Sequence, residues 1–253
     1  VPPEPMTGYQ DRAARYAGVY QFLRFDPRMI EKINDEEVII RANRDGTLSA
    51  SFTEGRWVEV EPLLFKRVDG EGLLAFREDS RGNITDLFTD HWPWAFQKRH
   101  WYDSKGFRVP LIVISLLIFL STLVVWPIST WLARKHQSHA NRGGKVARLA
   151  RLTAGVISLL NLLFVTLLVP TLIVDSQGGA VAILNGLPPV LVGALVIPLL
   201  TTALTIVLAV FAILAWKRRF WSLGGRIHYT LVATAAVVFV WSLAYLNLIG
   251  FHY

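Results

Sequence analysis

Residues 109–131, VPLIVISLLIFLSTLVVWPISTW, decide the architecture of this chain because they form a run of 23 residues without a charged side chain. About 20 apolar residues in a helix are enough to cross the hydrocarbon core of a bilayer. The run therefore predicts a transmembrane helix. Residues before it are mostly polar or charged, whereas most of those after it are apolar. We expect a water-exposed part at 1–108 and a transmembrane domain at 109–253.

The charges are divided unevenly between these two parts. Residues 1–108 hold 16 of the 26 Lys and Arg residues and 18 of the 19 acids, whereas residues 109–253 hold ten bases and a single acid, Asp175. All ten bases fall into two short segments between apolar runs, and such bases mark the cytoplasmic side of a membrane protein. The net charge of +7 is therefore read as a topology signal, and no nucleic-acid partner is expected.

Four apolar runs predict four spans, at about 109–133, 152–174, 188–216 and 229–250. The segments after the first and third spans carry the bases, and the segment after the second carries only Asp175. This pattern predicts a multi-pass protein of a bacterial cytoplasmic membrane, with the N-terminal domain and the C-terminus outside. Bases of the inner segments and tryptophans near the span ends are the predicted topology and interface residues: Arg134, Lys135, Arg142, Lys145, Arg148, Arg151, Lys217, Arg218, Arg219, Trp92, Trp94, Trp101, Trp126, Trp131, Trp216 and Trp221.

Short runs with strand-like alternation, separated by turn residues, fill most of residues 17–100. The predicted strands are 17–24, 37–43, 47–52, 56–61, 63–68, 73–77, 84–89 and 94–98. Asp45-Gly46, Glu54-Gly55, Asp69-Gly70 and Arg81-Gly82-Asn83 have the chemistry of tight turns. Residues 1–16 are interpreted as a linker, 27–34 as a short helix and 101–108 as a juxtamembrane aromatic segment. The predicted fold is an extracytoplasmic antiparallel β-barrel or sandwich followed by a four-helix transmembrane bundle, an α+β membrane protein.

Aromatic side chains are expected to fill the interior of this β domain. The candidates are Tyr20, Phe22, Phe25, Phe52, Trp57, Phe65, Phe76, Phe88, Trp94 and Phe96. A barrel of about eight strands can also hold a small ligand, so a ligand-binding interior remains the alternative.

Motifs of catalysis and cofactor binding are missing from the sequence. It contains no G-x-S-x-G, S-x-x-K, H-E-x-x-H, P-loop or G-x-G-x-x-G motif, and no Cys. His136 and His139 lie among bases without a carboxylate, which disfavours a metal site. Tyr245 and Asn247 spell Y-x-N, but no Ser or Lys partner accompanies them. We predict no catalytic, cofactor-binding or metal-ligating residue in this chain, and the predicted spans without charged residues disfavour an ion-coupled transporter.

Several strings of the β domain resemble a known family. They are YAGVYQFLRFDPRMIEKI, DGTLSASF, RWVEVEPLLFKRVDGEGLLAFRED and ITDLF, of which WVEVEPLLF and LAFRED are the most telling. Together they resemble the region that follows the catalytic domain in membrane-bound bacterial serine hydrolases of the β-lactamase-related, penicillin-binding-protein-like family. The similarity covers residues 9–133 and includes no catalytic residue of that family.

The resemblance implies that the chain holds a hydrolase at the membrane and does not itself catalyse a reaction. We expect a membrane anchor and accessory β domain of a β-lactamase-like serine hydrolase of the peptidase, esterase or amidase type. The Ser-x-x-Lys domain would lie upstream in a longer polypeptide or on another chain. The expected partners are the lipid bilayer and that catalytic domain, and the oligomeric state stays open. The alternative is a ligand- or lipid-binding β-barrel sensor or chaperone with a membrane docking unit.

Overall fold

The structure is a computed structural model that describes residues 3–23, 37–90, 94–135, 144–178 and 193–249. The chain divides into two compact units, Val1–Arg108 and Val109–Tyr253. The first unit contains the β strands, and the second contains the long apolar helices. Of the predicted elements, the short helix at 27–34 lies outside the described residues.

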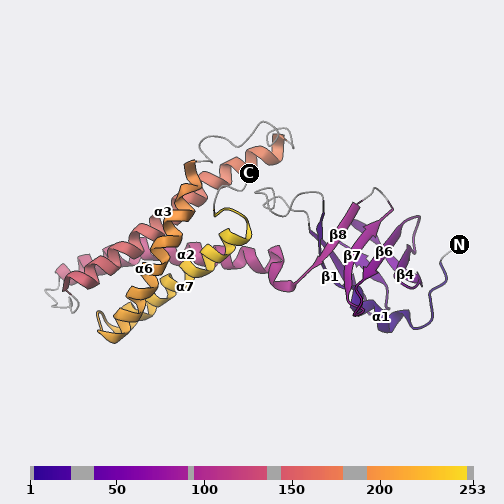
Figure 1. Ribbon diagram of the computed structural model, residues 1–253, viewed down its shortest axis with the longest axis horizontal. Helices are drawn as coiled ribbons and strands as arrows, with labels where there is room; N and C mark the ends of the chain where they lie inside the picture. The colour runs from indigo at the N-terminus through magenta and orange to yellow at the C-terminus, as the bar shows by residue number, and fades with distance from the viewer. Residues whose placement is uncertain (1–2, 24–36, 91–93, 136–143, 179–192, 250–253) are drawn as a thin grey trace. The chain divides into compact units, whose positions relative to one another are not determined.

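The first unit is a closed antiparallel β-barrel, which confirms the predicted fold class (Figure 1). Each strand pairs with its neighbour in the sequence, and β1 pairs with β8 through Val19–Arg99 and Phe22–Phe96. Closure in this way leaves no strand edge unpaired. The strands are β1 (Gly18–Phe22), β2 (Glu37–Ala42), β3 (Leu48–Ala50), β4 (Thr53–Glu61), β5 (Leu64–Arg67), β6 (Leu73–Glu78), β7 (Ile84–Thr89) and β8 (Trp94–Arg99).

Two of the four predicted turns depend on a glycine in the left-handed region. Gly46 has φ 82° between β2 and β3, and Gly82 has φ 80° between β6 and β7. The prediction of a turn at Glu54-Gly55 is wrong, because both residues lie inside β4. Ser51 and Phe52 make that connection instead, as a turn too short for the sequence pattern to separate it from the strand.

Five of the ten expected aromatic residues form the barrel core with 5% exposure or less: Tyr20, Trp57, Phe65, Phe76 and Phe96. Phe22 packs against this core while partly buried. The prediction is wrong for Phe52 and Phe88, which are exposed. Alternation along β7 explains Phe88, because its neighbour Leu87 is fully buried and successive side chains point to opposite faces. Phe25 and the side chain of Trp94 lie outside the described residues.

The predicted linker contains a helix that belongs to the barrel. Helix α1 (Tyr9–Tyr16) buries Ala13 and Tyr16, and both side chains are part of the same core as the strands. The prolines Pro2, Pro3 and Pro5 precede this helix and do not interrupt it. Interpretation of residues 1–16 as a linker is therefore wrong for residues 9–16, whose apolar face has the spacing of a helix.

The second unit consists of helices of membrane-spanning length. They are α2 (Lys105–Lys135), α3 (Gly144–Gly178), α6 (Val196–Lys217) and α7 (Leu223–Tyr245). Each contains a candidate span of at least 22 residues with high mean hydropathy, and a helix of that length extends for about 33 Å. The four candidate spans confirm the prediction of a transmembrane domain.

The boundaries of the predicted spans need correction because the helices continue beyond the apolar runs. Helix α3 begins at Gly144, so Lys145, Arg148 and Arg151 lie on a helix and not in a loop. Helix α2 begins at Lys105, before the apolar run, where the Lys105 backbone N–H donates to the Glu37 carboxylate at 2.9 Å. Lys and Arg are good helix formers, so a hydropathy pattern underestimates the helix length. The start of the predicted span 188–216 lies partly outside the described residues.

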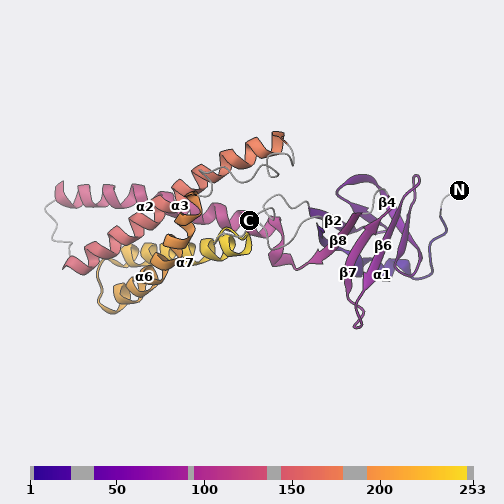
Figure 2. The same ribbon diagram turned by 45° about the horizontal axis from the view of Figure 1, so that its top comes forward.

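Helices of the second unit pack through small residues and a few aromatic rings. Helix α3 lies beside α6, and α6 forms a hairpin with α7 (Figure 2). Ala150 and Ala154 on α3 are fully buried, one helical turn apart, as is typical of close helix contacts in membranes. Phe119 on α2 meets Phe239 on α7 edge to face, with 5.6 Å between the ring centroids.

Replacement of a core ring tests the barrel as described. We expect Phe65→Ala to destabilise the barrel by about 3–5 kcal/mol, because it removes a buried ring and leaves a cavity. Phe88→Ala is the matched control, since this ring is exposed, and we expect a loss of at most about 1 kcal/mol. Hydrogen exchange of barrel peptides in the purified chain measures both effects. Equal losses for the two variants would contradict the described core.

Candidate functional site

The barrel interior is a packed aromatic cluster. The ring of Tyr16 from α1 lies 4.7 Å from Phe65 and 4.8 Å from Phe76, measured between centroids. Phe65 and Phe76 are 5.4 Å apart in an edge arrangement. No residue of this core is more than 7% exposed to solvent. Among the described residues, the interior is therefore filled by the protein's own side chains, as rings in a core prefer to pack.

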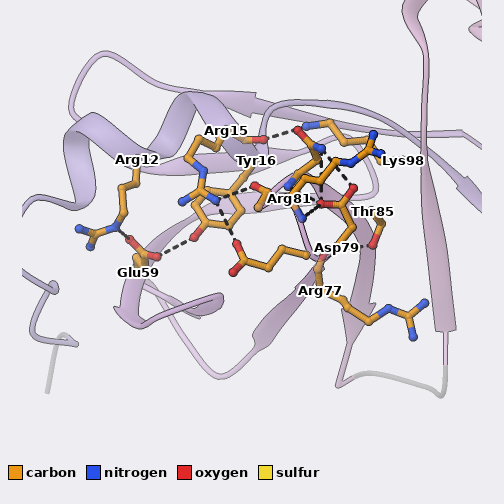
Figure 3. A network of polar contacts seen from close by, with 12 residues as sticks. Arg12, Arg15, Tyr16, Glu59, Arg77, Asp79, Arg81, Thr85 and Lys98 are labelled. Carbon is orange, nitrogen blue, oxygen red and sulfur yellow. Dashed lines mark hydrogen bonds and ion pairs between the residues drawn. The ribbon is translucent and has the colours of Figure 1, made fainter.

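One charged side chain points into this interior. Glu59 lies two residues after the buried Trp57 on β4 and so faces the same way, and its side chain is 1% exposed. Its carboxylate accepts hydrogen bonds from the Tyr16 hydroxyl and from the Arg12 Nε, both at 2.7 Å (Figure 3). Both donors come from α1, so the buried charge is compensated by the helix that covers this end of the barrel.

The two buried tyrosines act as neutral hydrogen-bond donors. Burial, together with the hydrogen bond to Glu59, raises the pKa of Tyr16 to about 12. Burial likewise raises the pKa of Tyr20, whose hydroxyl donates to the Tyr16 backbone carbonyl at 2.6 Å. Because both phenols stay protonated at neutral pH, they fix α1 on the barrel and do not act as nucleophiles.

A second group of polar contacts surrounds the C-terminal end of α1. Arg15 donates to the Glu78 carboxylate at 3.0 Å and to the Gly82 carbonyl at 2.8 Å. Lys98 Nζ donates to the Arg15 carbonyl at 2.8 Å, and burial lowers the pKa of this lysine. The partners of the helix at this end therefore come from β6, β8 and the β6–β7 turn, and Figure 3 shows Arg15 and Lys98 among them. The contacts hold α1 in place and include no pairing of a nucleophile with a base.

Asp79 and Asp86 are also occupied by structural contacts. Asp79 accepts from the backbone N–H groups of Arg81 and Asn83, which lowers its pKa and fixes the β6–β7 turn. The Asp86 carboxylate is bound by Arg77 at 2.8 Å and by the Thr85 hydroxyl at 2.6 Å. Among the described residues, no group of three or more His, Cys, Asp or Glu side chains is arranged to hold a metal ion.

The second unit contains a Ser–His contact that the sequence did not indicate, because the residues lie 107 positions apart. Ser121 Oγ on α2 is 3.0 Å from His228 Nε2 on α7. The serine hydroxyl also bonds the Ile118 carbonyl, and His228 Nδ1 has no hydrogen-bond partner among the described residues. A catalytic Ser–His pair needs a third group that orients the imidazole. The contact therefore has the geometry of a helix-to-helix hydrogen bond.

An aromatic and basic cluster occupies the end of this unit where α6 turns into α7. Trp126 stacks on Tyr229 with their rings at 9°, and Trp221 lies 5.1 Å from Tyr229 between centroids. The Tyr229 hydroxyl donates to the Ala150 carbonyl of α3 at 3.3 Å. The guanidinium of Arg151 lies 5.1 Å from the Trp221 ring centroid. These contacts join α2, α3 and α7, and we call Trp126, Trp221, His228 and Tyr229 the tryptophan cluster.

The predicted topology and interface residues differ in their exposure to solvent. Lys145, Arg148, Lys217, Arg218 and Arg219 are exposed, whereas Trp221 is buried. Trp101, Trp131 and Trp216 are exposed at 69%, 61% and 45%. Arg134 and Lys135 end α2, and Trp94 begins β8. The side chains of Arg134, Lys135 and Trp94, and the whole of Trp92, Arg142, His136 and His139, lie outside what the structure describes.

Two polar side chains are buried in the middle of α3. Asn161 and Ser158 are 1% and 0% exposed, and neither has a side-chain hydrogen-bond partner among the described residues. They lie three positions apart and therefore share a helix face. By contrast, Thr201 and Thr205 on α6 return their hydroxyls to backbone carbonyls of their own helix. Their burial on one face of α3 is typical of helix packing in membranes.

Comparison of the chain with protein-family models, with curated proteins and with solved structures returns no match. Any assignment of function therefore rests on the residues and geometry of this chain. The resemblance to the β-lactamase-related hydrolases stays a prediction.

Alkaline titration tests the buried Tyr16–Glu59 contact. The pKa of Tyr16 is about 12 in the folded state, against an ordinary 10.0, so the unfolded chain releases this proton first. Barrel stability should therefore be insensitive to this group below pH 10 and should fall as the pH rises from there towards 12. In Tyr16→Phe the loss of stability that the Tyr16 hydroxyl causes above pH 10 should be absent. The variant is nevertheless less stable than the wild type at neutral pH, because Glu59 loses a hydrogen-bond donor. Urea unfolding of both proteins at several pH values measures the difference, and parallel curves would contradict the contact.

Proposed function

We propose that this chain is the membrane anchor and accessory β domain of a serine hydrolase of the β-lactamase-related type. The observation that carries the proposal is the packed interior of the barrel. A β domain whose interior is occupied by its own rings presents only its outer surface to partners. That property suits a module which packs against a catalytic domain, and it disfavours the ligand-binding sensor.

The strings that resemble the family coincide with residues that build the barrel. Trp57 and Phe65, at either end of WVEVEPLLF, are core residues, and Glu59 between them is the buried carboxylate that holds α1. LAFRED supplies Leu74 and Phe76 to the core. These residues support a shared β domain. They supply no catalytic group, so the Ser-x-x-Lys domain belongs upstream in the polypeptide or on another chain.

Tethering would confine the hydrolase to the membrane surface. The four apolar helices anchor the chain, and the barrel would hold the catalytic domain close to membrane-associated substrates. Confinement raises the effective concentration of such substrates without adding contacts. The bases at the α2–α3 and α6–α7 connections support an orientation with these connections in the cytoplasm and both termini outside.

A serine-reactive fluorophosphonate probe tests the hydrolase assignment. The native protein should be isolated from its own membranes through a tag on Tyr253, both as the longest polypeptide that carries residues 1–253 and with its bound partners. We expect the probe to label a protein that contains or binds this chain, and to leave residues 1–253 unlabelled when they are expressed alone. Labelling of residues 1–253 alone, or no labelled species in the isolated material, would contradict the proposal.

Cysteine accessibility in intact cells tests the orientation. Residues 1–253 contain no Cys, so an introduced thiol is the only one within them, and the protein without the substitution serves as the labelling background. We expect Ser176→Cys to react with a membrane-impermeant maleimide and Ser138→Cys to remain unlabelled, because bases flank Ser138 and short basic segments stay inside. Both variants should react after the membrane is permeabilised. If only Ser138→Cys is labelled in intact cells, the orientation is the reverse of the one proposed, and the chain cannot be an outward-facing anchor.

A further inference from the structure

The tryptophan cluster contains buried hydrogen-bond donors without acceptors. Trp221 is 7% exposed, and its indole N–H has no hydrogen-bond partner among the described residues. The Nε of Arg226, four residues after Ser222 in the first turns of α7, is buried and also without a partner there. Both groups can only donate. Because a buried donor without an acceptor destabilises a protein, each of these two groups calls for an acceptor that the described residues do not supply.

The cations beside these donors make no ion pair with the residues that the structure describes. Arg151 lies over the Trp221 ring, and the Arg226 guanidinium lies 5.0 Å from the Trp216 ring centroid. The only acid in residues 109–253 is Asp175. Asp175 is on the same helix as Arg151, 24 residues further along, which corresponds to about 36 Å. The side chain of Asp175 lies outside what the structure describes, but its place on α3 is far from that of Arg151. The missing acceptor is therefore expected to be an anion.

The surroundings of the two arginines are apolar and exposed. Leu149 and Leu152 flank Arg151 on α3 and are 53% and 62% exposed. Leu223 and Ile227 flank Arg226 on α7 and are 56% and 46% exposed. All four lie on helices of membrane-spanning length, where exposed apolar side chains contact acyl chains. A ligand that combines an anionic group with hydrocarbon chains matches both kinds of surface.

We propose that this end of the helical unit binds the phosphate of an anionic phospholipid. Trp221 and Arg226 donate hydrogen bonds to the phosphate oxygens, and Arg151 supplies charge. Leu149, Leu152, Leu223 and Ile227 contact the acyl chains. Basic pockets between transmembrane helices recognise lipid head groups in this way. The inference requires that the helices lie in a membrane, but it is independent of the hydrolase assignment.

Native mass spectrometry of the purified chain, titrated with phosphatidylglycerol or phosphatidylcholine in detergent, tests the site. We expect preferential binding of phosphatidylglycerol, and a loss of affinity of about fivefold for Arg151→Gln and for Arg226→Gln. Arg148→Gln is the matched control, since it removes the same charge from an exposed position of α3, one turn from Arg151. At high salt, which screens exposed charges, this control should change the affinity less than twofold. Equal losses for Arg148→Gln and Arg151→Gln would overturn the site.

Two further measurements keep the test decisive if a variant fails to fold. A photoactivatable phosphatidylglycerol should label wild-type peptides that contain Trp221 or Arg226, and labelling confined to other peptides would overturn the proposal. Inorganic phosphate distinguishes the source of the anion. It should not raise the melting temperature at concentrations where the lipid does, and equal stabilisation by free phosphate would overturn the assignment to a lipid.

Discussion

The hydrogen bonds of Glu59 are the interaction on which the barrel depends. This carboxylate points into an apolar interior, and a buried charge without partners is strongly destabilising. Its two donors, Tyr16 and Arg12, both belong to α1. The helix therefore has to dock for the interior to be stable, and its docking places the Tyr16 ring against both Phe65 and Phe76. Docking of α1 therefore closes this end of the barrel and neutralises the buried Glu59 carboxylate at the same time.

Pairing of β1 with β8 is the second requirement, because it joins segments separated by almost the whole domain. Val19 opposes Arg99, and Phe22 opposes Phe96, whose ring contributes to the core. The same closure brings Lys98 to the C-terminal end of α1, where it donates to the Arg15 carbonyl. A module of this kind has a fixed outer surface and a packed interior, and that combination supports an accessory role over a ligand carrier.

The helical unit differs from the barrel in how its charges are arranged. They lie near the helix ends, and the structure describes no ion pair among them. Bases accompany the α6–α7 turn and the start of α3, while the only acid of this unit lies near the far end of α3. Aromatic rings take the place of carboxylates as neighbours of Arg151 and Arg226. Rings attract cations through their faces, but they accept no conventional hydrogen bonds from guanidinium groups. The proposed anionic lipid would supply the counter-charge that the described residues of this unit do not.

Local sequence patterns were sufficient for most of the fold. Alternation with period two located the eight strands, and charge-free runs located the helices, because both depend on which side chains face water or lipid. The same patterns misassigned residues 9–16, where prolines outweighed a short amphipathic helix, and they placed Phe52 and Phe88 inside the barrel. Face assignment depends on register, and one residue of shift moves a side chain to the other face. The basic starts of α3 and α7 were read as loops, because hydropathy reports the apolar run and not the helix.

Contacts between distant residues were decided only by the tertiary structure. Tyr16 and Glu59 are 43 positions apart, and Arg151 and Trp221 are 70 positions apart. Nothing local to either residue indicates such a partner, since a buried glutamate and an exposed one look alike in a strand. The sequence by itself determined the division into a β domain and a membrane domain, together with the sign and place of the charges. The fold then decided that the barrel is filled, that α1 neutralises its buried charge, and that two arginines of the helical unit meet tryptophan rings, because each outcome depends on how separate elements pack.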